Sequence, residues 1–192
     1  MKTARARWTS LDLPIWIVFA VLLISGLVVQ RSVERRTETF SDPQGTFKVP
    51  YPSGWLPVPG SSSLLDVQNP ATGAPVPTRL IVTREARDAD QTLQQVATDA
   101  ILRRSRELPM YRVLWQRPVG IAGKEAAGIG YAFVADPHEV VLAAERVPVS
   151  VRGLHVIVLV QGAAYHIDFR AATSVYWRDR PVYGRILRQV QL

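Results

Sequence analysis

The sequence predicts a mixed α/β (α+β) protein, in which a single N-terminal transmembrane helix precedes one domain. Three observations support this prediction. An uncharged apolar run extends over Leu13–Val29. Apolar residues then recur every three to four positions within Asp90–Leu108, which is typical of an amphipathic helix. From Met110 to Arg170 apolar and polar residues alternate between short turns, which indicates an antiparallel sheet.

The apolar run is long enough to be a membrane span. A helix over Leu13–Val29 would be roughly 25 Å long, and one more turn would match a hydrocarbon core of about 30 Å. We expect an uncleaved signal anchor, because the charged segment that follows the run offers no small-x-small cleavage site. The segments before and after the apolar run contain nearly equal numbers of basic residues. The large C-terminal part favours a cytoplasmic N-terminus and an extracytoplasmic domain in the inner or cell membrane.

The chain divides into four parts by this reasoning: a short basic tail (1–12), the transmembrane helix (13–30), a polar linker (31–40) and a soluble domain (41–192). The net charge of +7 favours anionic lipid headgroups or an acidic partner. We expect no nucleic-acid partner, because no basic helix or basic–aromatic motif accompanies the charge. The chain has no cysteine, which excludes disulfides and thiolate chemistry.

Local patterns place the elements of the soluble domain. Its expected strands are Thr46–Tyr51, Leu64–Gln68, Leu80–Thr83, Tyr111–Pro118, Glu125–Ala135, Val140–Val151, Leu154–Gln161 and Ala164–Ala171. Asp90 is the expected N-cap of the long helix, which Pro109 ends. A short helix is expected from Thr173 or Ser174, and a separate last helix after Pro181.

Both ends of this domain resemble one known family. The segment DPQGTFKVPYPSGW at Asp42–Trp55 looks like the opening strand of PsbP-like and Mog1-like domains. The ending is also similar, with a strand of alternating aromatics followed by a tryptophan and a helix: Tyr165–Phe169, Trp177, Tyr183, Ile186 and Leu187. The resemblance implies an α/β/α sandwich on a twisted antiparallel sheet. It also implies a non-enzymatic accessory role in membrane complexes, including photosynthetic ones, with bacterial members often membrane-anchored and exported.

One polar cluster is the main candidate for chemistry. A hairpin that turns at Gly162-Ala163 would place His166 opposite Leu159, and would put His155, His166 and Asp168 on one sheet face. Such a cluster could hold a metal or perform acid–base chemistry. It could equally be a polar strip bonded to itself or to a covering helix. Because there are only two imidazoles and no third ligand, we predict no metal site, no catalytic residue and no cofactor.

Aromatic residues offer a second candidate surface. Five of them exceed what a core strictly needs: Trp55, Trp115, Tyr176, Trp177 and Tyr183. Most should be buried. Any that stays exposed beside arginine would mark a protein interface, where tryptophan, tyrosine and arginine are enriched.

We therefore predict a non-catalytic, membrane-anchored accessory or assembly subunit of a larger complex, photosynthetic or respiratory. Its partners would be other subunits of that complex and the lipid bilayer. Ala20, Ser25 and Gly26 would let other spanning helices approach closely. The alternative is a membrane-tethered module that binds a small ligand in a cleft between sheet and helix. An enzyme would rest on the polar cluster alone.

Overall fold

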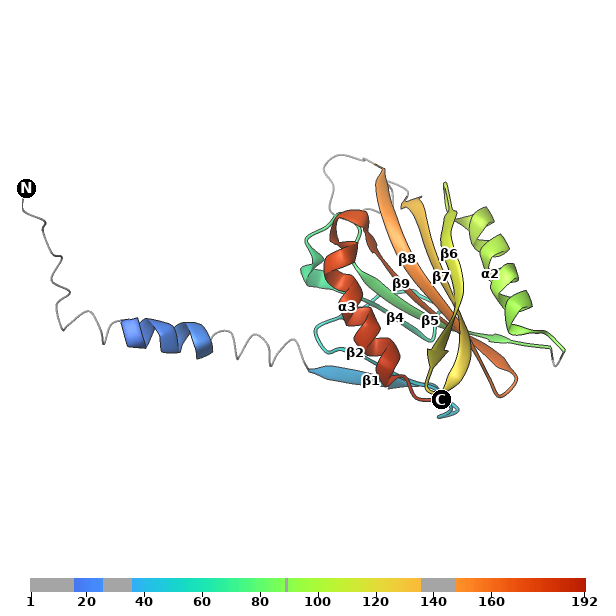
Figure 1. The fold of residues 1–192 in the computed structure, drawn as a ribbon, viewed down its shortest axis with the longest axis horizontal. Coiled ribbons are helices and arrows are strands. Elements are labelled where there is room, and N and C mark those ends of the chain that lie inside the picture. Colours follow the sequence, from blue (N-terminus) through green and yellow to red (C-terminus); the bar gives the residue numbers. More distant parts are fainter. Residues whose placement is uncertain (1–15, 26–35, 89, 136–147) are drawn as a thin grey trace, which may run out of the picture. The chain divides into compact units, whose positions relative to one another are not determined.

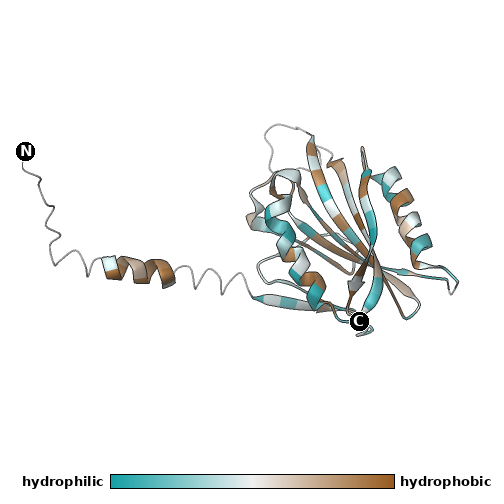
Figure 2. Ribbon diagram, viewed as in Figure 1, coloured by the Kyte–Doolittle hydropathy of each residue, from teal (hydrophilic) through white to brown (hydrophobic). Residues whose placement is uncertain are grey.

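The computed structural model describes residues 16–25, 36–88, 90–135 and 148–192, and the chain forms two compact units, Met1–Thr37 and Glu38–Leu192. In the first unit, residues 16–25 form an uncharged, mainly apolar helix (Figure 2). Within the ranges described, no helix has both the length and the apolar character needed to cross a membrane. The two ends of the predicted span, 13–15 and 26–30, lie outside these ranges.

The second unit is built on a seven-stranded antiparallel sheet with the order β3-β4-β5-β9-β8-β7-β6 (Figure 1). Its strands are β3 (Leu56–Pro57), β4 (Leu65–Gln68), β5 (Arg79–Ala86), β6 (Arg112–Ile121), β7 (Lys124–Ala135), β8 (Val149–Val160) and β9 (Ala163–Ala172). A separate two-stranded sheet pairs β1 (Thr37–Ser41) with β2 (Lys48–Pro52). The unit therefore begins inside the segment 31–40 that was expected to be a linker.

One helix covers each face of the sheet (Figure 1). Helix α2 (Leu93–Glu107) packs against one face, and α3 (Thr173–Gln189) packs against the other with the larger core. Strand residues alternate between the two faces, so Val156 and Val158 join the α3 core whereas Ile157 joins the α2 core. The predicted α+β class and antiparallel sheet are confirmed.

The start of α2 differs from the prediction. Thr92, and not Asp90, is the N-cap, because it forms a reciprocal capping box with Gln95. The Thr92 Oγ1 atom accepts from the Gln95 backbone N–H at 3.3 Å, and the Gln95 Oε1 atom accepts from the Thr92 backbone N–H at 2.7 Å. These two hydrogen bonds satisfy two backbone N–H groups at the start of the helix. Asp90 would have to satisfy them from outside the first turn.

Helix α3 is continuous, so the predicted break before Pro181 is wrong. Pro181 lies inside the helix and costs one backbone hydrogen bond. Tyr176, before the proline, and Tyr183 and Ile186, after it, are all buried in the same core. This apolar stripe on both sides of the proline holds the two halves in one helix.

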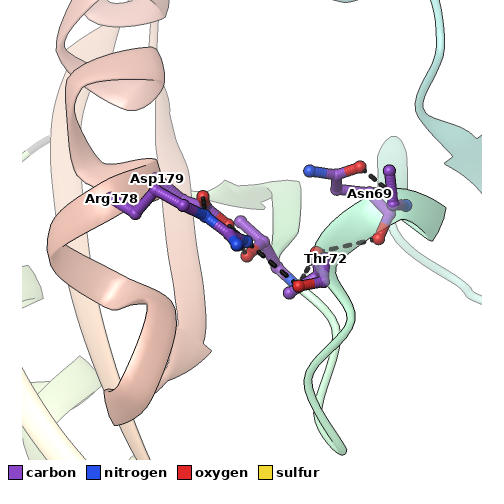
Figure 3. Close-up of polar contacts among 6 residues, drawn as sticks. Asn69, Thr72, Arg178 and Asp179 are labelled. Atoms are coloured by element: carbon purple, nitrogen blue, oxygen red, sulfur yellow. Dashed lines mark hydrogen bonds and ion pairs between the residues drawn. The ribbon is translucent and has the colours of Figure 1, made fainter.

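A polar network fastens the start of α3 to the loop between β4 and β5 (Figure 3). Arg178 pairs with Asp179 and donates from Nη2 to the carbonyl oxygen of Thr72 at 3.0 Å. Arg178 Nε donates to Asp179 Oδ1, and the buried hydroxyl of Thr78 donates to Asp179 Oδ2. Asn69 caps the turn that carries Thr72, accepting from the Ala71 N–H at 3.0 Å. The network fixes the turn of α3 on which Trp177 stands.

Strand β8 also corrects the prediction. It runs unbroken through Gly153, where the sequence suggested a gap between the strands Val140–Val151 and Leu154–Gln161. The glycine is needed because the Tyr131 ring occupies the place of a side chain at position 153. Residues 140–147 of the first predicted strand lie outside the described ranges.

Candidate functional site

A pocket of about 590 Å³ lies between α2 and the β5–β9–β8 part of the sheet. It exists because one helix, about 10 Å wide, covers only about two strands spaced by about 4.8 Å. Helix α2 packs on β7 and β8, where Ala97 and Ala100 allow close approach to Ile157. The neighbouring part of this face is lined instead by polar side chains. We call this cavity the α2 pocket.

Two stacked histidines line the α2 pocket. His155 Nε2 and His166 Nδ1 are 3.0 Å apart, and both side chains are buried. The hairpin between β8 and β9 turns at Gln161-Gly162, which both have positive φ, and not at the predicted Gly162-Ala163. His166 therefore lies opposite Ile157, and His155 lies opposite Asp168. The corrected register moves the pairing by two residues and so keeps all three polar residues on one face.

Asp168 is held by two partners. Its carboxylate accepts from the Tyr131 hydroxyl at 2.7 Å and from Arg104 Nη1 at 3.2 Å. The Arg104 guanidinium also lies 5.0 Å from the centre of the Tyr131 ring. Burial raises the pKa of Tyr131 well above its usual value, and the Asp168 charge adds to this, so the hydroxyl stays a donor. Each oxygen of the Asp168 carboxylate therefore accepts a hydrogen bond.

Glu85, whose side chain is about half exposed, lies against the buried histidine pair. It makes a two-point ion pair with Arg103, with distances of 2.8 and 3.3 Å, and its Oε2 atom lies 3.3 Å from His166 Nε2. The hydrogen bond from Arg103 is the largest cause of a lowered pKa at Glu85. Both partners are about half exposed, so this pair contributes little stability.

The histidines are neutral at neutral pH. Burial lowers the pKa of His166 to about 4, and burial also lowers the pKa of His155 well below its usual value. One of the two facing nitrogens, His155 Nε2 or His166 Nδ1, carries the proton of the hydrogen bond between the rings. The two outer nitrogens, His155 Nδ1 and His166 Nε2, are buried without a hydrogen-bond partner among the described residues. The floor of the pocket is thus polar but uncharged.

The predicted cluster of His155, His166 and Asp168 does lie together, but it is only part of the site. Sequence reasoning missed Glu85, Arg103 and Arg104, which come from β5 and α2. Nowhere in the described ranges do three His, Asp or Glu side chains gather closely enough to hold a metal.

A second feature lies on the other face of the sheet. Trp177 on α3 is 60% exposed, and the Cζ atoms of Arg152 and Arg180 lie 5.6 and 5.3 Å from its ring. Half-buried Trp115 on β6 covers Gly130 and carries Arg117 at 4.8 Å from its ring. A small cleft of about 70 Å³ is lined by both tryptophans. We call Trp115, Arg117, Arg152, Trp177 and Arg180 the Trp177 patch. The other three candidate aromatics, Trp55, Tyr176 and Tyr183, are buried.

Of the residues expected to pack between spanning helices, Ala20 and Ser25 belong to the helix at residues 16–25. The Ser25 hydroxyl donates to the Val21 carbonyl at 2.7 Å, within its own helix. Gly26 lies outside the described ranges.

The chain matches no protein-family model, and no curated protein matches it significantly in sequence. Solved structures do match it. The PsbP protein of the cyanobacterium Synechocystis sp. PCC 6803 (CyanoP) aligns with a TM-score of 0.58 and 16% identity, covering 81% of this chain and 92% of its own.

Two further structures agree. LpqN of Mycobacterium tuberculosis, described as involved in cell envelope biogenesis, has a TM-score of 0.55 at 13% identity, with 81% and 90% coverage of this chain and its own. The Ran-binding protein Mog1p of Saccharomyces cerevisiae has a TM-score of 0.53 at 10% identity, with 81% and 95% coverage. At these identities the likeness concerns the fold. The resemblance seen at the two ends of the sequence is confirmed at that level: the chain has a PsbP/Mog1-like fold.

Proposed function

We propose that this protein is a non-catalytic accessory subunit, anchored in a membrane by its N-terminal segment, that docks an acidic segment of a partner protein on the Trp177 patch. The single observation that carries the proposal is the large exposed indole of Trp177 between two arginines. Tryptophan and arginine are the residues most enriched among those that dominate protein binding energy. An indole held in place in the free protein also loses little entropy on binding.

The support beneath Trp177 is rigid. Its neighbour Arg178 is fastened to Thr72, as Figure 3 shows, and Asp179 accepts from the Thr78 hydroxyl. Tyr176 contacts the indole edge-on with ring centroids 5.2 Å apart. The residues of the patch come from α3, β6 and β8, which contribute to one hydrophobic core, and the polar network ties α3 to the loop between β4 and β5. Such pre-organisation favours binding without rearrangement.

The charge of the patch favours an acidic partner. Arg117, Arg152 and Arg180 form no ion pair with any residue of the described ranges, so three guanidinium groups stand around two indoles. Clusters of this kind pair with carboxylates, and they speed association at low ionic strength. The net charge of +7 acts in the same direction.

The membrane part of the proposal rests on the run Leu13–Val29. Its described residues, 16–25, are helical and carry no charge. We propose a single pass with a cytoplasmic N-terminus and an extracytoplasmic domain, where Ala20, Ser25 and Gly26 face helices of a photosynthetic or respiratory complex. One solved structure of similar fold is a Ran-binding protein, which supports a role in binding.

The test is site-specific crosslinking in membranes, followed by purification in mild detergent. A photoreactive residue at position 177 should capture one stoichiometric protein, and the crosslinked peptide should be rich in Asp and Glu. Trp177→Ala should weaken co-purification by at least about 30-fold, the effect of a hot-spot residue. Arg180→Glu should weaken it more strongly at low salt than at high salt.

Two controls make the result specific. Arg185→Glu changes the same charge on an exposed position of α3 outside the patch, and Leu102→Ala removes an exposed side chain on the other face. Both should leave co-purification intact. Crosslinks to lipid or to a non-acidic peptide, or equal losses in the control variants, would overturn the docking proposal.

Replacement of Leu13–Val29 by a poly-Leu span should weaken incorporation of the protein into the complex. Unchanged incorporation would mean that the run is a simple anchor.

A further inference from the structure

We propose that the α2 pocket binds a small soluble oxyanion, a carboxylate or phosphate group, with Arg170 as the residue that receives it. This site lies on the opposite sheet face from the Trp177 patch and does not depend on the docking role. It would make the protein a ligand-binding module as well as an accessory subunit.

The size of the α2 pocket fits a small molecule. Its volume of about 590 Å³ falls within the range of about 300–1,000 Å³ that is usual for ligand sites. The walls come from three elements: α2 contributes Arg103 and Arg104, β5 contributes Thr83 and Glu85, and β9 contributes Arg170. Most of the groups that line it are polar, so it suits a hydrophilic ligand better than a lipid chain.

Two arginines that line the pocket, exposed Arg84 and half-buried Arg170, form no ion pair with any described residue. Asp168 is engaged by Arg104 and Tyr131, and Glu85 is engaged by Arg103. Arg170 is half-buried, lines the cavity and makes no hydrogen bond or ion pair through its side chain to any residue in the described part of the chain. A partly desolvated guanidinium without a partner is costly, and its planar fork matches a carboxylate or phosphate at two points.

The other groups around the site favour the same ligand class. Arg104 approaches from α2 and contacts Asp168, two residues from Arg170 on the same face of β9, so an anion beside Arg170 would lie near two guanidinium groups, whereas the Asp168 carboxylate already has partners. The histidine pair contributes a neutral floor, in which His155 Nδ1 and His166 Nε2 are buried and make no hydrogen bond within the described part of the chain. Glu107 also lines the pocket, as an exposed residue in the last turn of α2.

Anion binding should be linked to the histidines. An anion in the pocket stabilises the imidazolium form, so it should raise the pKa of His166 from about 4, and its own affinity should increase as the pH falls toward that value. The charged groups that face His166 are Glu85 from β5, Arg103 and Arg104 from α2, and Asp168 from its own strand, with His155 adjacent on β8. The pKa of His166 therefore reports anion binding independently of the measured affinity.

The experiment uses the full-length chain in a nonionic detergent, titrated with succinate and, separately, with inorganic phosphate. Calorimetry measures the affinity, and NMR of ¹⁵N-labelled histidine follows the two imidazoles. At least one probe should bind, shift the His155 and His166 signals, and raise the pKa of His166. Whichever probe binds more tightly identifies the group as a carboxylate or a phosphate.

Variants decide whether Arg170 is the receiving residue. Arg170→Gln should reduce the affinity at least tenfold, and Arg170→Lys, which keeps the charge but loses the two-point contact, should reduce it less. Arg106→Gln is the matched control, because Arg106 is an exposed arginine of α2 that does not line the pocket. Equal affinity in Arg170→Gln and Arg106→Gln, or no binding of either probe at millimolar concentration, would overturn the proposal.

Discussion

Acidification should destabilise the folded domain through the buried histidine pair. The pKa of His166 falls from an ordinary 6.5 to about 4 on folding. Between these two pH values the unfolded chain binds a proton that the folded chain excludes. The stability due to neutral His166 is therefore complete above pH 6.5 and is lost as the pH falls toward 4.

The magnitude follows from the size of that shift. Each pKa unit corresponds to 1.36 kcal/mol, so His166 alone should lower the free energy of unfolding by about 3 kcal/mol over the whole interval. This is a large share of the total stability of an ordinary domain, about 5–15 kcal/mol. His155 is buried more completely and its pKa is lowered in the same direction, so it adds to the loss.

Urea unfolding of the full-length chain in nonionic detergent, followed by tryptophan fluorescence, measures the effect between pH 4 and pH 7.5. His166→Gln keeps a polar side chain that does not titrate, so its stability should depend less steeply on pH. Glu85 and Asp42 also have lowered pKa values and lose stability in acid; Asp42 does so in both proteins, whereas part of the lowering at Glu85 is due to His166 and is absent from the variant. Parallel stability curves for the two proteins, or a pKa of His166 near 6.5 by NMR, would refute the reasoning.

Three further changes test the packing. Gly153→Ala should cost about 1–3 kcal/mol in the free energy of unfolding and displace the Tyr131 ring, which near-ultraviolet circular dichroism would report. Asp179→Ala should cost about 1–3 kcal/mol, because the buried Thr78 hydroxyl loses its acceptor; a change below 0.5 kcal/mol would contradict the role of that network. Ala97→Leu should overpack the contact between α2 and the sheet by about 1–3 kcal/mol, with a lower thermal midpoint, whereas exposed Leu102→Ala should have little effect.

The sequence predicted the elements of the sheet where local chemistry decides them. Alternation located β7 and β9, and the periodicity of apolar residues located α2, because both patterns depend on the face that each residue presents to the core. The misplaced N-cap of α2 was a local error, since Thr92 and Gln95 form a capping box within four residues, but two other errors came from tertiary contacts. Nothing local at Gly153 shows that the Tyr131 ring will cover it, and nothing local at Pro181 shows that the core will hold both halves of α3 together.

The candidate site was predicted in part for the same reason. His155, His166 and Asp168 belong to one hairpin, so alternation alone puts them on one face whichever of the two turns forms. Glu85 and Arg104 reach the site from β5 and α2, and their arrival depends on strand order and on where the helix settles. The sequence predicted exposure of Trp177 only as an alternative to its burial. The spacing of apolar residues in a helix cannot distinguish a buried aromatic residue from one just outside the apolar stripe.

The pairing of β5 with β9 has a consequence for the order in which the chain folds. Their register joins Ala86 to Ala163 and Arg79 to Arg170. At a synthesis rate of about 5–20 residues per second, β5 waits roughly 4–15 seconds for its partner to be made. During that time its edge, rich in Leu80, Ile81 and Val82, is open to other strands. The meander from β6 to β9 can form locally, so the α2 pocket, whose floor spans the junction of β5 and β9, is completed last.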